Sequence, residues 1–247
     1  MEVIELRINR KIIDCQDPVE CRNIKRKYVV IECIINKKDS DFLYYMNKAW
    51  DLAKKVNPKR ANDSLNIREK NVIIIDALGG VLAEYGWQQY INKEFGKIAE
   101  FTDFKDSSSQ IDLLLSNKKT IEVRSSFPRN GVKFAICNDR YNFKNICKYS
   151  NLYKSSEIDK DFFAATLFKT SKNNLLIEEE IVFYLIGGST KEMMMDKSIS
   201  YKESLTVEDD LNKFKTDYKV VKLLNALDIC GFEKYMESMG YKKLSNY

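Results

Sequence analysis

The sequence has 247 residues, of which 44% are hydrophobic and 31% are charged, a composition typical of a folded globular protein. It contains no run of about 18 apolar residues that would form a transmembrane helix. Its acidic first residues lack the basic and apolar regions of a signal peptide, so we expect a cytoplasmic protein that does not enter a membrane. The chain has no histidine, which excludes Ser-His-Asp triads, Cys–His dyads and zinc sites that need this side chain.

Positive charge is concentrated in one part of the chain. The formal net charge is +5, and residues 113–154 alone contain nine Lys or Arg residues against two acids. A clustered basic stretch is typical of a protein that binds phosphate groups. A solvated, lysine-rich surface would produce the same composition and is the alternative.

The first third of the chain predicts two strands and two helices. Residues 3–14 alternate loosely, and β-branched residues fill 27–35, as in strands. Apolar residues at helical spacing predict a helix over 41–56 and a longer one over 68–92. Three glycines interrupt the longer helix, which is typical of close packing against a neighbouring element: Gly79, Gly80 and Gly86.

The middle of the chain predicts a sheet. Three short strands are expected, at 97–104, 110–115 and 120–125, with a fourth at 132–137. A helix over 141–152 precedes an apolar run at 162–168, which is typical of a strand buried on both faces. A strand at 181–186 and a helix at about 219–239 complete the chain. The order helix, three strands, helix, strand indicates an α/β (α+β) fold with a central mixed sheet.

Two of these strands each carry one acid between apolar residues, Asp112 between Ile111 and Leu113 and Glu122 between Ile121 and Val123. A short hairpin would bring the two carboxylates together on one face. A buried carboxylate needs a partner, and a divalent cation, which prefers oxygen ligands, would be one. Arg124 would point to the same face as Glu122 and meet an anion at that cation. A buried ion-pair cluster of these groups is the alternative.

Glu84 adds a third acid, on an apolar stripe of the helix at 68–92. It would support the cation site, or it would be a residue of the helix surface. Two further acids, Asp139 and Asp161, are explained by a turn and by the entry to a strand.

Together these residues resemble the PD-(D/E)xK nuclease superfamily, which has an αβββαβ core. In that resemblance Glu84 is the helix acid, Asp112 is the isolated acid, and Glu122-Val123-Arg124 is the (D/E)-x-K tripeptide. The resemblance implies a restriction-endonuclease-like catalytic core over residues 69–170. Residues 1–68 and 171–247 would then supply DNA recognition or dimerisation.

The resemblance also implies a function, that of a Mg²⁺-dependent endonuclease of double-stranded DNA, most simply a type II restriction endonuclease that acts as a homodimer. Asp112, Glu122 and the Val123 carbonyl would hold Mg²⁺, with Mn²⁺ as a substitute. The residues expected to contact DNA are Lys118, Lys119, Arg129, Lys133, Arg140 and Lys144.

Arg124 departs from the family, which usually has Lys at this position, and Arg stays protonated at accessible pH. Either the metal alone then activates the attacking water, or a lysine from elsewhere reaches the site, with Lys118, Lys119 and Lys133 as candidates. A repair or junction-resolving nuclease and a catalytically silent DNA-binding protein of the same fold are the alternative functions. Arg124 is the main argument for the silent protein.

Overall fold

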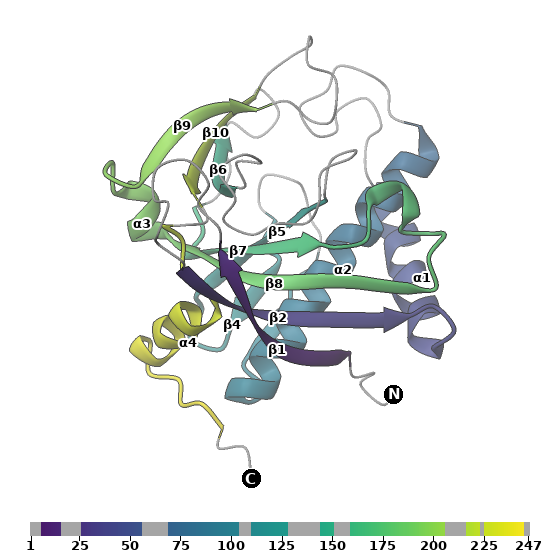
Figure 1. Ribbon diagram of the computed structural model, residues 1–247, viewed down its shortest axis with the longest axis horizontal. Coiled ribbons are helices and arrows are strands. Elements are labelled where there is room, and N and C mark those ends of the chain that lie inside the picture. Colours follow the sequence, from purple (N-terminus) through teal and green to yellow (C-terminus); the bar gives the residue numbers. More distant parts are fainter. Residues whose placement is uncertain are drawn as a thin grey trace.

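A seven-stranded sheet forms the centre of the computed structural model, which describes residues 6–15, 26–55, 69–103, 110–127, 144–150, 159–205, 216–222 and 225–244 (Figure 1). Its strands lie in the order β1-β2-β8-β7-β5-β4-β3. Only β5 and β7 pair in parallel; the other neighbours are antiparallel. The strand bounds are β1 (Arg7–Cys15), β2 (Arg26–Asn36), β3 (Ala99–Phe101), β4 (Leu113–Leu115), β5 (Thr120–Ser126), β7 (Phe162–Phe168) and β8 (Glu180–Thr190). The predicted mixed α/β class is confirmed.

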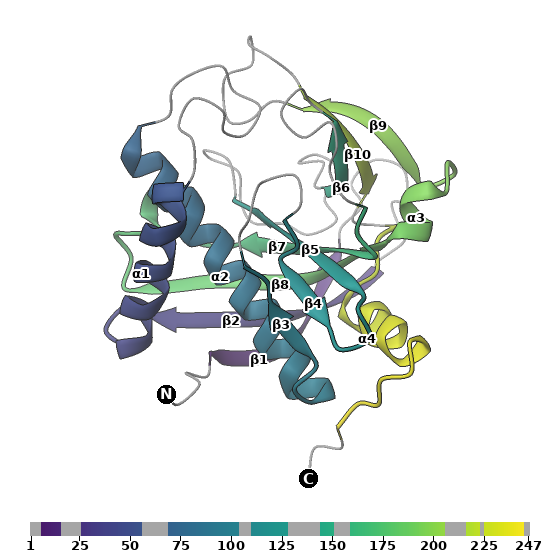
Figure 2. The same cartoon turned by 180° about the vertical axis from the view of Figure 1, so that it is seen from behind.

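The helix α2 (Lys70–Phe95) packs against β3, β5 and β8. Strands β2, β7 and β8 cross in front of it in Figure 1, and β3 and β4 lie in front of it when seen from behind (Figure 2). The curved sheet therefore covers α2 from more than one side, and buried residues occur all round this helix. Helices α1 (Ser40–Lys55) and α4 (Ile229–Ser238) contribute to the same hydrophobic core.

Two glycines of α2 mark its close approach to the sheet. A Cβ added at Gly79 would lie 2.7 Å from Phe127, and one added at Gly86 would lie 2.8 Å from Phe183, whereas nothing lies within 4 Å of a Cβ added at Gly80. Close packing, expected for three glycines, thus occurs at two. None of the described helices is long and apolar enough to cross a membrane.

A second, three-stranded sheet packs on the face of the central sheet opposite to α2. It consists of β6 (Lys144–Ser150), β10 (Thr216–Lys222) and β9 (Ser200–Leu205), with β10 in the middle and antiparallel to both neighbours. A 3-10 turn (Lys172–Asn174) precedes β8, and the short helix α3 (Lys191–Met195) connects β8 to β9. Met194 of α3 and Val221 of β10 pack with Phe163 and Tyr184, on the face of the central sheet opposite to α2.

Two predicted helices are wrong in part. The helix expected at 141–152 is a strand, β6, over 144–150, and the helix expected at 219–239 begins only at Ile229, because residues 216–222 form β10. The two strands pair with each other, Val220 opposite Ile146, and this pairing fixes an extended backbone in both segments. The strand predicted at 132–137 lies outside the described residues.

The predicted order αβββαβ is present in part. Helix α2 is followed by β3, β4, β5 and then β7, the strand parallel to β5. The second helix of that order is not found among the residues described between β5 and β7, where β6 lies. Strands β3 and β4 are shorter than expected, and β8 is longer.

Candidate active site

Asp112 and Glu122 lie beside each other at the end of the β4–β5 hairpin. The ladder pairs Leu113 with Ile121, and one further step in the same register places Asp112 opposite Glu122. Both side chains are buried, with 8% and 6% of their surface exposed. Asp112 lies just before β4, not inside the strand as expected, and Glu122 lies in β5, so the two carboxylates come together at this end of the hairpin, where the sequence suggested a cation.

The main chain of Val123 is oriented toward Asp112. Its N–H donates a hydrogen bond of 2.7 Å to Asp112 Oδ2. Since the N–H and C=O of one strand residue point to the same edge of the strand, the Val123 carbonyl faces the Asp112 side as well. Asp112, Glu122 and this carbonyl form a set of hard oxygen donors, which suits Mg²⁺ or Mn²⁺.

Two cationic side chains contact the Glu122 carboxylate. Arg124 Nη2 lies 2.9 Å from Oε1, and Lys160 Nζ lies 3.8 Å from Oε2. The Arg124 side chain is 25% exposed, whereas that of Lys160 is 1% exposed. Lys160 Nζ also donates to the carbonyl oxygen of Gln110, two residues before Asp112. A buried lysine therefore links the segments that carry the two acids.

Glu84 lies on α2, the helix that packs against β5. The residue is half-buried, and the pKa of its carboxyl is raised well above its ordinary value, chiefly by burial and further by the negative charges of Asp112 and Glu122. The three acids therefore form a region of negative potential, which favours a cation. Among the described residues, however, no three carboxylate or thiol side chains converge as a ready-made metal site, so Glu84 is placed as a neighbour of the Asp112–Glu122 pair.

Lys160 is held in place by the residue that follows it. Asp161 Oδ2 accepts hydrogen bonds from the N–H and the hydroxyl of Thr120, at 2.9 and 3.0 Å, and the Asp161 N–H donates to the Thr120 carbonyl. The start of β7 is thereby fastened to the start of β5. The parallel pairing of Ile121 with Phe162 continues from this point and brings Lys160 close to Glu122.

The lysines expected near the site lie elsewhere or outside the described residues. Lys118 and Lys119 are exposed in the β4–β5 turn, and Lys119 forms a 2.7 Å ion pair with Asp161. Lys144 is the first residue of β6. Arg129, Lys133 and Arg140 fall outside the described residues.

Lys160 was not identified from the sequence. The one available signal is a lysine two residues before the apolar run at 162–168, in a position where the chain is about to become buried. Its neighbours Asp159 and Asp161 are exposed and half-buried, so the sequence does not single out Lys160 as the buried residue. A buried amine requires an acidic partner, and here that partner is Glu122.

The site thus combines paired carboxylates, a partly exposed arginine and a buried lysine, which lie on β5 or just before β4 and β7. Carboxylates can bind a cation, and the guanidinium can bind a phosphate through paired hydrogen bonds. No family model, curated protein or solved structure matches the chain.

Proposed function

We propose that this protein is a divalent-metal-dependent endonuclease that hydrolyses phosphodiester bonds in double-stranded DNA. Mg²⁺ is the proposed cofactor and Mn²⁺ a substitute, and a type II restriction endonuclease is the specific form we favour. The observation that carries the proposal is the buried Asp112–Glu122 pair, with Arg124 and Lys160 both in contact with Glu122. The succession of α2, β3, β4 and β5, with β7 parallel to β5, supports it, because this part of the order agrees with the resembled nuclease core.

The proposed roles follow from exposure and charge. Asp112, Glu122 and the Val123 carbonyl would hold the cation. When bound, such a cation neutralises phosphate charge and lowers the pKa of a water. Arg124 is partly exposed and permanently charged, so it would bind the scissile phosphate. Lys160, buried against Glu122, would hold this carboxylate in position.

The assembly that we propose is a homodimer. Cleavage of both strands at one place requires two active sites of opposite polarity, and two-fold symmetry provides them.

A catalytically silent DNA-binding protein is the second candidate. Both oxygens of the Glu122 carboxylate already face a cationic group, Arg124 on Oε1 and Lys160 on Oε2. An ion-pair cluster with a purely structural role would have the same contacts. Metal binding separates the two functions, since only the nuclease requires it.

The test compares purified wild type with Asp112→Asn and Glu122→Gln on supercoiled plasmid, with Mg²⁺, Mn²⁺ or Ca²⁺. Both variants should lose cleavage by at least about 10²-fold, and calorimetric titration with Mn²⁺ should show weakened binding. Glu32→Gln is the matched control, since Glu32 is also a buried strand acid paired with a lysine, Lys11, outside this site. It should leave cleavage and Mn²⁺ binding unchanged.

Three results would contradict the proposal. Wild type that neither binds Mn²⁺ nor cuts DNA with any of the metals would favour the silent protein. Cleavage by Glu122→Gln at the wild-type rate would place the active site elsewhere. Mn²⁺ binding that Asp112→Asn and Glu32→Gln alter equally would show that the two acids have no particular role.

A further inference from the structure

One side-chain oxygen beside the candidate active site is buried and accepts no hydrogen bond from the described residues. It is Oε1 of Gln110. The amide nitrogen of the same side chain donates at 3.1 Å to the carbonyl oxygen of Ile111. This bond fixes the orientation of the amide, because a carbonyl oxygen can only accept and so requires the NH₂ group. The acceptor end of the Gln110 amide is therefore the end that lacks a partner.

Gln110 belongs to the same polar cluster as the two acids. Asp112 follows it after one residue, and the main-chain carbonyl of Gln110 accepts a hydrogen bond from Lys160 Nζ. The same Nζ lies 3.8 Å from Glu122 Oε2, and the lysine side chain is 1% exposed. The glutamine side chain therefore starts from a point in the interior, between the segments that carry Asp112 and Glu122.

Two donors at this place are already engaged with other acceptors. The hydroxyl of Thr102 donates to the carbonyl of Ile111, the same oxygen that receives the Gln110 amide nitrogen. The amine of Lys160 donates to the main chain of Gln110 and faces Glu122. Neither group serves the Gln110 amide oxygen.

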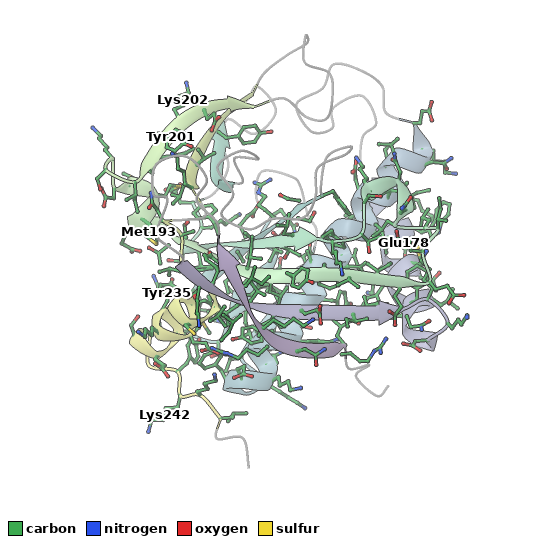
Figure 3. The ribbon with its side chains drawn as sticks, viewed as in Figure 1. Glu178, Met193, Tyr201, Lys202, Tyr235 and Lys242 are labelled. Atoms are coloured by element: carbon green, nitrogen blue, oxygen red, sulfur yellow. The ribbon has the colours of Figure 1, made fainter. Side chains whose placement is uncertain are left out.

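Helix α4 fixes the segment that carries Lys160 from another direction. Tyr235 of α4 lies beside the central sheet (Figure 3), its ring stacks on Phe162 at a centroid distance of 5.1 Å, and its hydroxyl donates at 3.5 Å to the carbonyl of Asp161. Lys160 is therefore held where it is, between Glu122 and the main chain of Gln110. A partner for the amide oxygen has to come from outside the described part of the chain.

A divalent cation has the chemistry that this oxygen lacks. A buried acceptor without a partner reduces the stability of the folded state, and amide oxygens are hard ligands that Mg²⁺ and Mn²⁺ accept together with carboxylates. Mg²⁺ prefers an octahedral set of oxygens. Two carboxylates and the Val123 carbonyl would fill only part of that set, and the charges of Asp112 and Glu122 favour a cation near them.

We propose that the amide oxygen of Gln110 is a further ligand of the divalent cation, beside Asp112, Glu122 and the Val123 carbonyl. The inference rests on the proposed function for the presence of a cation. On this assignment, Gln110 contributes to cation binding without contributing to the stability of the cation-free protein.

The test is calorimetric titration with Mn²⁺ alone, without DNA, together with thermal unfolding of the cation-free protein. Gln110→Met, which keeps the length of the side chain and removes its oxygen, should weaken Mn²⁺ binding by at least about 10-fold. Its thermal midpoint without Mn²⁺ should equal or exceed that of wild type, because an unpaired buried acceptor is removed. Gln110→Glu should bind Mn²⁺ at least as tightly as wild type, since a carboxylate is also an oxygen ligand.

Gln89→Met is the matched control, at a half-buried glutamine of α2 whose amide is bonded at both ends. Gln89 Oε1 accepts from the Leu6 N–H at 2.7 Å, and its Nε2 donates to the Tyr45 hydroxyl at 3.2 Å. Its loss should lower the thermal midpoint and leave Mn²⁺ affinity unchanged. The two glutamine variants should therefore show opposite patterns.

Mn²⁺ affinity that stays at the wild-type value in Gln110→Met would overturn the inference, and plasmid cleavage by wild type would in that case leave the nuclease proposal intact. An equal loss of affinity in Gln110→Met and Gln110→Glu would also overturn it, because both variants lack the amide nitrogen and only one lacks the oxygen. Mn²⁺ binding that depends on Gln110 in a protein that cuts no DNA would support the inference and reject the nuclease.

Discussion

Arg124 of β5 and Lys160, two residues before β7, approach the Glu122 carboxylate from two segments, but they differ in what else they can reach. The Arg124 side chain is 25% exposed and that of Lys160 only 1%. An incoming phosphate can therefore meet the guanidinium, whereas the amine stays enclosed between Glu122 and the Gln110 carbonyl. In the proposed nuclease, this difference would assign Arg124 to the substrate and Lys160 to the position of Glu122.

At Arg124 we predict a graded loss of activity. Arg124→Ala should slow single-turnover cleavage on the order of 10²–10³-fold, because it removes a charge at the site of the scissile phosphate. Arg124→Lys should retain part of the rate, since the charge remains although the planar guanidinium is lost. The control is Arg7→Ala, which removes an exposed arginine of β1 that pairs with Glu180 of β8, outside the candidate site. Full activity in Arg124→Ala would assign the phosphate contact to another residue.

The acids of the candidate site could be predicted from the sequence, but the buried lysine could not. Asp112 and Glu122 belong to one hairpin, where local register decides that they meet. Lys160 reaches Glu122 through the parallel pairing of β5 with β7, a contact between segments far apart in the chain. Periodicity describes local structure and contains no information about such pairing.

The residue range of helix α2 could be predicted from the sequence, but the way the sheet packs around it could not. The expected helix over 68–92 is Lys70–Phe95 in the structure. Its apolar pattern does not indicate that the sheet covers it from several sides, because a helix with apolar residues all round has no single apolar face that would mark the side of the core. The glycines indicate this: a Cβ added at Gly79 or Gly86 would meet the ring of Phe127, just after β5, or of Phe183 in β8, whereas one added at Gly80 would meet nothing within 4 Å.

The different surroundings of Gly80 and Gly86 predict that a change to alanine stabilises the protein at one position and destabilises it at the other. Gly80→Ala should raise the free energy of unfolding by about 0.5–1 kcal/mol, since alanine favours the helix and the position is open. Gly86→Ala gains the same preference but forces a Cβ to 2.8 Å from Phe183, and overpacking costs about 1–3 kcal/mol. Urea unfolding should therefore rank Gly80→Ala above Gly86→Ala. Equal stability of the two variants would mean that Phe183 moves aside without cost.

The strands of the small sheet, β6, β9 and β10, could not be predicted from the sequence, and the reason is physical. In β6, apolar Ile146 and aromatic Tyr149 are three residues apart, which imitates helical spacing. In β9 (SYKESL) polar residues predominate, so no strand pattern is visible. These segments are strands because they pair with β10, and pairing partners are set by tertiary structure rather than by local preference.

At the scale of the whole molecule, one carboxylate connects distant parts of the chain. Glu233 of α4 accepts hydrogen bonds from Arg10 of β1 at 2.6 Å, from Tyr90 of α2 at 2.7 Å and from Lys243 at 2.7 Å. These partners are 223, 143 and 10 residues away in sequence. The network was not predicted, because nothing in the pattern of α4 indicates which distant cations would reach it. It fastens α4 and the segment after it to the rest of the core.

Glu233 should make stability depend on pH. Burial alone would raise the pKa of its carboxyl, but hydrogen bonds from Arg10, Lys243 and Tyr90 outweigh burial and lower the pKa from 4.5 to about 2. Because this pKa is lower in the folded state than in the unfolded state, the ionised Glu233 carboxylate stabilises the folded protein. This stabilisation is complete above the unfolded pKa, near 4.5, and is lost as the pH falls toward about 2. At neutral pH the contribution is on the order of 2–3 kcal/mol.

Glu233→Gln should therefore lower the free energy of unfolding at pH 7 by that amount, and the difference from wild type should stay constant down to about pH 4.5 and shrink below it. Urea unfolding of both proteins across this range measures it. Glu237→Gln, at an exposed position of the same helix, should change stability little at any pH. A loss in Glu233→Gln that is equal at every pH would show that the side chain acts through its packing, and that its charge does not fasten α4 to the core.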